Sequence, residues 1–205
     1  MIYPDLRRRV HSALALHGFE HYRHGLVGHC RPEGIEVVEV GVGEAGVQPA
    51  LFTCAKSLAD GVPMGALVSN EKFADVFTPG AHASTFGGNP LASAAALAVI
   101  KIIEDEKLLD AAVRKGELLR EGLKCFVEKY DKILDVRGLG CMVGMVVDGD
   151  PKEIVDAFRE MGVLVLTAHG NVVRFLPTLS MSEKHIEEAV EMMADALDGL
   201  YGEAE

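Results

Sequence analysis

The amino-acid sequence predicts an α/β protein that ends in a small α+β unit, with a few largely antiparallel strands and helices on one face. Three observations support this prediction. Helical periodicity alternates with short β-branched runs after residue 90, proline and serine signals mark the helix starts, and 49% of the 205 residues are hydrophobic. This length and this hydrophobic content suffice for one domain with a proper core, or for two small ones.

Two consecutive helices are expected between residue 90 and about residue 130. The first begins at Asn89-Pro90, because asparagine caps helices and proline fits the first helical position. Residues 91–100 are nearly all apolar, which indicates a buried helix. In the second helix, apolar residues recur with a period close to 3.6, as they do on one face of an amphipathic helix. These residues are Leu108, Ala112, Leu119, Leu123 and Phe126.

The strands of the C-terminal unit follow these helices. Residues 136–147 are strand-like, and their glycines indicate bends or a close approach of the backbone. Residues 163–167 and 171–176 predict a hairpin around residues 168–170.

Two more helices complete the unit. One is capped by Asp150-Pro151 and ends at Gly162, and the other starts at a capping box formed by Ser180 and Glu183. The expected inner faces are Ile154, Val155, Phe158 and Met161 in the former, and Ile186, Val190, Met193 and Leu197 in the latter.

Composition excludes several classes of protein. The chain has 20 Lys and Arg residues against 31 Asp and Glu, a formal net charge of −11, so a surface that wraps nucleic acid is not expected. No apolar run approaches the roughly 20 residues that span a bilayer, so no membrane association is expected. The four cysteines stand far apart without a CxxC pair, which favours reduced thiols and a cytoplasmic location.

Residues 1–45 differ in composition from the rest of the chain. They contain no lysine, and they hold five of the eight histidines. His17, His21 and His24 would share one face of a helix, with Cys30 nearby, which is a possible metal site. However, glycines interrupt the stretch and no second group of ligands has zinc-like spacing. A solvated histidine-rich segment, with no metal, is therefore the favoured interpretation.

Lys56 is the first lysine of the chain, and its neighbours are mainly apolar. A lysine removed from water has a lowered pKa, because burial disfavours the charged form, and its amine can then form a Schiff base with a carbonyl. The alternative is a lysine whose stem covers apolar surface while its ammonium reaches water. The local sequence alone favours that alternative.

Two other segments offer groups that bind anions. Ser84 and Thr85 precede two glycines and a helix start, a combination that suits a phosphate or carboxylate, although a glycine-rich turn is the simpler explanation. Arg174 lies in a strand-like apolar run, where its charge must be paired or must bind a carboxylate. A position on the solvent face of the strand is about equally compatible with the local sequence.

Four motifs together resemble the class III, pyridoxal-phosphate-dependent aminotransferases. Residues 46–66 resemble the lysine segment of that family, residues 82–92 its phosphate loop, and residues 136–140 and 171–177 its small-domain motifs, in the same order. The 29 positions between Lys56 and Thr85 also fit. The likeness runs from about residue 46 to residue 200 and is strongest to members of the acetylornithine type.

The resemblance implies a fold and an activity. The fold would be the type I fold of pyridoxal-phosphate-dependent transferases, with residues 46–105 as the C-terminal part of the large cofactor-binding domain and residues 106–205 as the small domain. Residues 1–45 would be an atypical segment without a family match. The implied reaction moves an amino group from an N-acylated diamino acid to 2-oxoglutarate in arginine or lysine biosynthesis, in a homodimer.

The resemblance also implies roles for four residues. Lys56 would bond to pyridoxal phosphate and, once displaced by substrate, would move the proton between the substrate and the cofactor. Thr85 would bind the cofactor phosphate across the dimer interface. Ser84 would lie beside the substrate, and Arg174 would face a substrate carboxylate.

The sequence departs from the family pattern in its first part. Members have a long upstream half that supplies the ring stacked on the cofactor, the acid beside the pyridine nitrogen and the arginine for the α-carboxylate. Residues 1–45 offer no counterpart to these groups, and Asp60 stands where the family usually has glycine. The chain is therefore expected to be the C-terminal portion of such an enzyme, and the alternative function is that of a truncated, catalytically incompetent relative.

Overall fold

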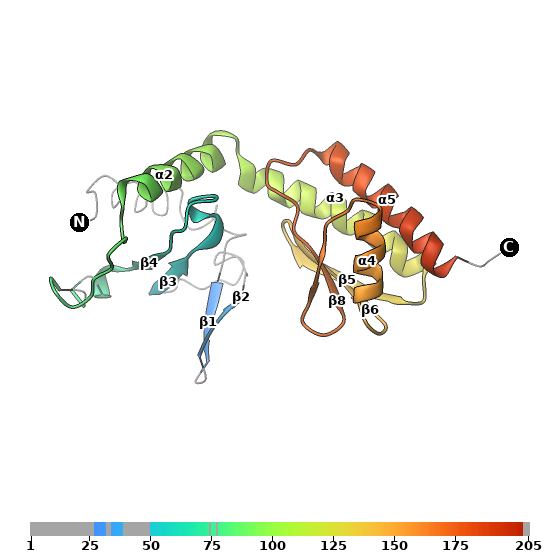
Figure 1. The fold of residues 1–205 in the computed structure, drawn as a ribbon, viewed down its shortest axis with the longest axis horizontal. Coiled ribbons are helices and arrows are strands. Elements are labelled where there is room, and N and C mark those ends of the chain that lie inside the picture. The colour runs from blue at the N-terminus through green and yellow to red at the C-terminus, as the bar shows by residue number, and fades with distance from the viewer. Residues whose placement is uncertain (1–26, 32–33, 39–49, 74, 77, 203–205) are drawn as a thin grey trace. The chain divides into compact units, whose positions relative to one another are not determined.

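The computed structural model describes residues 27–31, 34–38, 50–73, 75–76 and 78–202, the first two ranges by their backbone alone. The chain divides into two compact units, residues 1–109 and residues 110–205, which are coloured blue to green and green to red in Figure 1. The proposed histidine cluster of His17, His21 and His24 lies outside the described residues.

The described part of the first unit contains two antiparallel strand pairs and one long helix. Strand β1 (Val27–Arg31) pairs with β2 (Gly34–Val38), and β3 (Leu51–Cys54) pairs with β4 (Ala66–Ser69). The remaining elements are the short helices η1 (Lys56–Leu58) and η2 (Glu71–Phe73) and the helix α2 (Pro90–Asp105).

Helix α2 confirms the predicted start but not the predicted burial. Asn89 is its N-cap, and the side-chain Oδ1 accepts a hydrogen bond of 2.9 Å from the backbone N–H of Ala92. Of the described residues, only the small side chains of Ala92, Ser93 and Ala96 are buried, whereas Leu91 is 71% exposed. Residues 91–100 are apolar almost all round the helix, and the described residues bury only one narrow stripe of them.

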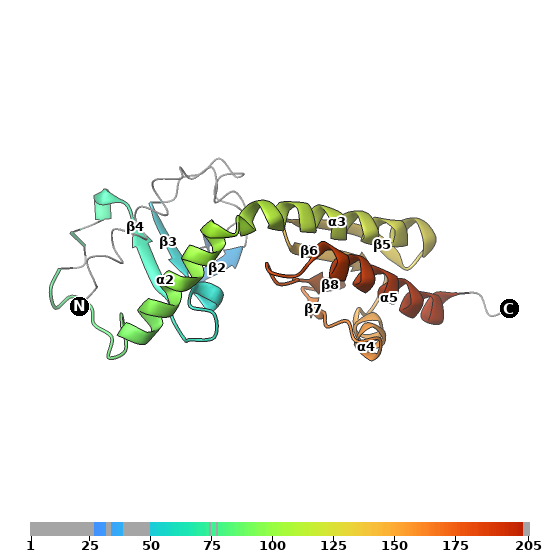
Figure 2. The same ribbon diagram turned by 90° about the horizontal axis from the view of Figure 1, so that it is seen from above.

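The second unit is a four-stranded antiparallel sheet with three helices. Helix α3 (Leu108–Lys129) leads into it, and the strand order is β5-β6-β8-β7. Figure 2 shows α3 and α5 running side by side. The other elements are β5 (Ile133–Leu139), β6 (Met142–Val147), α4 (Lys152–Glu160), β7 (Leu166–Ala168), β8 (Val172–Phe175) and α5 (Glu183–Tyr201).

The predicted strands are present with shifted bounds. The strand-like run at 136–147 is a hairpin, β5 and β6, whose turn contains Gly140 with a φ of +51°. The glycines thus mark a bend, as predicted. The hairpin of β7 and β8 is also confirmed, although β7 covers only residues 166–168.

The predicted start and end of α4 are confirmed, whereas the capping box predicted for α5 is wrong. Asp150 accepts a hydrogen bond of 2.9 Å from the N–H of Lys152 at the start of α4, and Gly162 follows its end with a φ of +89°. The N-cap of α5 is Ser182 rather than Ser180, because the Ser182 hydroxyl accepts from the N–H of His185 at 3.2 Å. The Ser180 hydroxyl instead lies 3.3 Å from that of Thr178.

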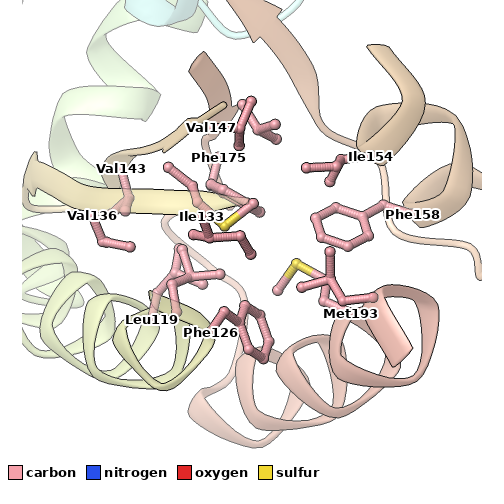
Figure 3. Packing of buried hydrophobic residues seen from close by; sticks show 14 of the residues in the cluster. Leu119, Phe126, Ile133, Val136, Val143, Val147, Ile154, Phe158, Phe175 and Met193 are labelled. Carbon is pink, nitrogen blue, oxygen red and sulfur yellow. The ribbon is translucent and has the colours of Figure 1, made fainter. Parts of the chain in front are cut away.

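One hydrophobic core holds the second unit together (Figure 3). The five apolar positions predicted on α3 are all buried, and so are Ile154, Phe158, Ile186, Met193 and Leu197 on the other two helices. Met161 was predicted to face inward, but it lies at the C-cap of α4 and is 38% exposed. Alternate residues of the sheet complete the core: Val136, Val143, Met145, Val147, Val173 and Phe175. The three helices therefore cover one face of the sheet.

A hydrogen-bonded group at the surface ties the end of α3 to α5. The Lys129 Nζ lies 2.7 Å from the Asp198 Oδ1, and the Tyr130 hydroxyl donates a 2.8 Å hydrogen bond to the same carboxylate. The hydrogen bonds from Lys129 and then Tyr130 hold the pKa of Asp198 below its ordinary value.

We expect this group to make the stability of the second unit depend on pH. Because the folded-state pKa of Asp198 is lowered, the stabilisation is present above the unfolded-state pKa and is lost as the pH falls through the folded-state value. The variant Asp198→Asn should therefore lose less stability on acidification than the unaltered chain, as measured by urea unfolding across a pH series. Asp195→Asn, an exposed position on the same helix, is the control. An unchanged pH dependence in Asp198→Asn would contradict the role of this carboxylate.

Candidate functional site

Lys56 adopts a backbone conformation that is unusual for a residue with a side chain. It follows β3 directly and opens η1, with a φ of +56°, after an extended Ala55. The backbone N–H of Leu58 donates to the carbonyl of Ala55 at 3.2 Å across the lysine. A left-handed conformation costs a non-glycine residue about 1 kcal/mol, so the surrounding structure must impose it. Strained positions of this kind concentrate at functional sites.

The side chain of Lys56 is exposed in the described first unit. The local sequence favoured such an exposed position over burial, and the described residues of this unit do not remove Lys56 from water. The neighbouring Cys54 is half-buried, and burial raises the pKa of its thiol. Cys54 is therefore a neutral neighbour for the lysine.

The turn after η1 contains the residue that departs from the family pattern. Asp60 has a φ of +33°, and Gly61 follows with a φ of +91°. Glycine adopts positive φ at little cost, whereas a residue with a Cβ is strained there. Asp60 thus adopts a backbone conformation that is strained for aspartate and that glycine would adopt more readily.

Ser84 and Thr85 lie exposed in a tight loop that leads into α2. The N–H of Gly87 donates to the carbonyl of Ser84 at 3.3 Å, and Gly88 has a φ of +67°. A Cβ on Gly87 would lie 3.0 Å from the Cβ of Ser84, so the loop closes tightly at this point. Two hydroxyls are thereby displayed beside the N-terminus of a 16-residue helix.

These groups fit the cofactor that the resemblance implies. The primary amine of Lys56 suits an aldehyde, and hydroxyls beside a helix N-terminus suit a phosphate. Lys56, Ser84 and Thr85 all belong to the first unit. Among the described residues, no hydrogen bond or ion pair joins Lys56 to either hydroxyl. A phosphorylated aldehyde is therefore a ligand that the available groups can hold.

Arg174 belongs to the second unit and lies on β8. Its neighbours Val173 and Phe175 are buried in the core, so Arg174 points to the opposite face of the sheet, which the helices do not cover. The side chain is half-buried, and no ion pair or hydrogen bond found within the described residues involves its guanidinium. The sequence left open whether Arg174 is paired or lies on the solvent face of its strand, and the structure places it on the outer face.

The structure places a second arginine level with Arg174. Arg137 on β5 pairs in register with Gly144 on β6, which in turn pairs with Arg174. Alternation from Val136 could have put Arg137 on the outer face, but the sequence does not show which residue of β8 lies opposite.

Metal-ligand clusters and membrane-spanning helices are both absent from the part of the chain that the structure describes. No group of three or more His, Cys, Asp or Glu side chains there is arranged to hold a metal ion. Among the described helices, none has the length and apolar character needed to cross a membrane.

Comparison with known proteins gives consistent matches. The family described as "Aminotransferase class-III" matches residues 41–197. An acetylornithine aminotransferase of Methanothermobacter thermautotrophicus is 41% identical over 155 residues, which are 76% of this chain and 40% of that protein. One from Synechocystis is 45% identical over 174 residues, which cover 78% of this chain and 40% of the relative.

Solved structures of related proteins have the same fold. An acetylornithine aminotransferase from Elizabethkingia anophelis matches with a TM-score of 0.72 and 33% identity, over 78% of this chain and 43% of that one. An ornithine aminotransferase from Toxoplasma gondii matches with a TM-score of 0.74 and 32% identity, over 80% and 40% of the two chains. The chain thus spans less than half the length of the relatives that it matches.

Proposed function

Because the chain belongs to the class-III aminotransferases, we propose that it takes part in pyridoxal-phosphate-dependent transfer of an amino group. The observation that carries the proposal is Lys56, an exposed amine on a strained backbone inside the region that matches the family. Lys107 is also an exposed lysine with a positive φ, so what distinguishes Lys56 is its place in residues 46–66, the segment that resembles the lysine segment of the family.

We propose that Lys56 holds the cofactor and moves the proton of the reaction. Its primary amine would hold the cofactor through the aldehyde and, when free, would act as the base that removes the proton from the amine-bearing carbon of the substrate and as the acid that gives it back. When bound, pyridoxal phosphate supplies the electron sink for that proton transfer. Thr85 binds the phosphate through its hydroxyl, contributed to the site of the partner subunit in a homodimer, and Ser84 lies beside the substrate.

Arg174 is proposed as a residue that binds a substrate carboxylate. Its guanidinium is unpaired among the described residues and lies on the open face of the sheet. A planar guanidinium binds a carboxylate through two parallel hydrogen bonds, which fixes both the position and the direction of the substrate.

The substrates are proposed from the names of the relatives. Acetylornithine aminotransferases predominate among the most similar proteins, so we propose an N-acylated diamino acid as amino donor and 2-oxoglutarate as acceptor, in arginine or lysine biosynthesis. Residues 46–105 would belong to the cofactor-binding domain and residues 106–205 to the small domain. The described cysteines, Cys54, Cys125 and Cys141, are free thiols, which supports a cytoplasmic site of action.

A turnover assay tests this function. The chain with pyridoxal phosphate is incubated with 2-oxoglutarate and either N-acetylornithine or ornithine, and glutamate is measured. The proposal expects glutamate with both donors, and more from the acetylated one. No glutamate above the level of a Lys56→Ala control would contradict it and would support the alternative of a catalytically incompetent relative.

A further inference from the structure

The outer face of the four-stranded sheet carries a row of residues with a glycine between two arginines. The register pairs Arg137 with Gly144 and Gly144 with Arg174, on three neighbouring strands. Because paired strands lie about 4.8 Å apart, the Cα atoms of the two arginines are separated by about 9.6 Å. Val136, Val143 and Val173, each one position earlier, are buried on the opposite face. Both arginines therefore project from the same side.

Gly144, between the two arginines, has no side chain of its own, and the side chain of Val172 packs close beside it. A Cβ on Gly144 would lie 3.0 Å from a methyl group of Val172, closer than most Cβ contacts. Any larger side chain at this position would also stand between the two guanidinium groups. Gly144 and Val172 thus form an apolar floor between the two cations.

The charges on this face favour an anion. Within the described residues, no ion pair or hydrogen bond occupies the guanidinium of Arg137 or of Arg174. Asp135 is the acidic residue of β5 nearest to Arg137, and it is exposed and forms no ion pair within the described part of the chain. In a chain of net charge −11, two arginines that are unpaired among the described residues, against one acid, make a locally basic surface.

From this arrangement we infer that Arg137 is a second carboxylate-binding residue, so that Arg137 and Arg174 together select a small dicarboxylate. Two flexible arginine side chains that start about 9.6 Å apart can converge on the two ends of a five-carbon dicarboxylate. Each end would then receive its own forked pair of hydrogen bonds. A monocarboxylate could engage only one of the two arginines.

This inference deepens the proposed function, because it names the substrate class of the Arg174 site, but its test needs neither the cofactor nor turnover. Glutarate and butyrate are unreactive probes with two carboxylates and one. Their binding to the full chain is measured by titration calorimetry or by NMR shifts, for the unaltered protein and for Arg137→Gln, Arg174→Gln and Arg159→Gln. Arg159 is an exposed arginine of the same unit, on α4 and in an ion pair with Asp156, and serves as the matched control.

Arg137→Gln is expected to weaken glutarate binding about tenfold and to leave butyrate binding unchanged, because it removes one charged hydrogen-bonding partner. Arg174→Gln should likewise weaken glutarate far more than butyrate, because Arg137 can still bind one carboxylate, and Arg159→Gln should weaken neither. Arg137→Lys should restore part of the glutarate affinity, since it returns the charge without the fork. An equal effect of Arg137→Gln on both probes, or no glutarate binding by the unaltered chain, would overturn the inference. If Arg137→Gln selectively lost glutarate binding in a chain that shows no turnover, that result would support the inference and contradict the proposed function.

Discussion

The substitution Gly116→Ala is expected to destabilise the second unit by about 3 kcal/mol, one of the two largest effects in this chain. Gly116 lies in α3, at the point where the helix meets the turn between β5 and β6. A Cβ added there would lie 1.8 Å from the carbonyl oxygen of Gly140 and 2.3 Å from its carbon. Both are backbone atoms of a turn that the paired strands hold in place, so the clash cannot be relieved by rotating a side chain.

A second glycine provides the matched control. Gly199 lies in α5 and has nothing within 4 Å of its added Cβ. Gly199→Ala should stabilise the helix by up to about 1 kcal/mol, because alanine has the higher helix propensity. Urea unfolding followed by far-UV circular dichroism measures both variants, since the chain has no Trp. Similar stabilities for the two variants would show that α3 does not approach the turn as closely as described.

Lys56→Ala is expected to lower cofactor affinity sharply and to reduce turnover about 10³-fold. The amine is the group that bonds to the cofactor aldehyde and moves the proton, and no alanine atom can replace either action. The measurements are the absorbance of the chain titrated with pyridoxal phosphate and the rate of glutamate formation.

Lys107→Ala is the control for this experiment. Lys107 is also an exposed lysine with a positive φ, +50°, so the substitution makes the same chemical change on a similar backbone. It should leave cofactor binding and turnover unchanged. Equal losses in the two variants would mean that the effect at position 56 comes from the backbone, and the role of the Lys56 amine would be wrong.

Local signals predicted the helices of this chain well. Asn89 caps α2 as its sequence context indicates, and the apolar period of α3 matches the buried face from Leu119 to Phe126. These features depend on residues within a few positions of one another. The N-cap of α5 was harder, because Ser180 and Ser182 both precede Glu183, and only the observed hydrogen bond to His185 distinguishes them.

Features that depend on distant residues could not be predicted. The strand pairing that brings Arg137 level with Arg174 joins segments more than thirty residues apart. The exposure of Leu91 depends on how much of α2 its unit covers, which composition does not reveal. At Lys56 the sequence and the family resemblance indicated the reactive group, whereas the strained backbone that presents it became visible only in the structure.

Trapping the cofactor on the protein tests the central claim most directly. The chain is mixed with pyridoxal phosphate, treated with borohydride to fix any bond between the cofactor and an amine, digested and mapped by mass spectrometry. We expect one modified lysine, Lys56, at one cofactor per chain, and no such modification of Lys56 when borohydride is omitted. Modification spread over the exposed lysines, or confined to a lysine other than Lys56, would contradict the assignment of Lys56 as the residue that holds the cofactor.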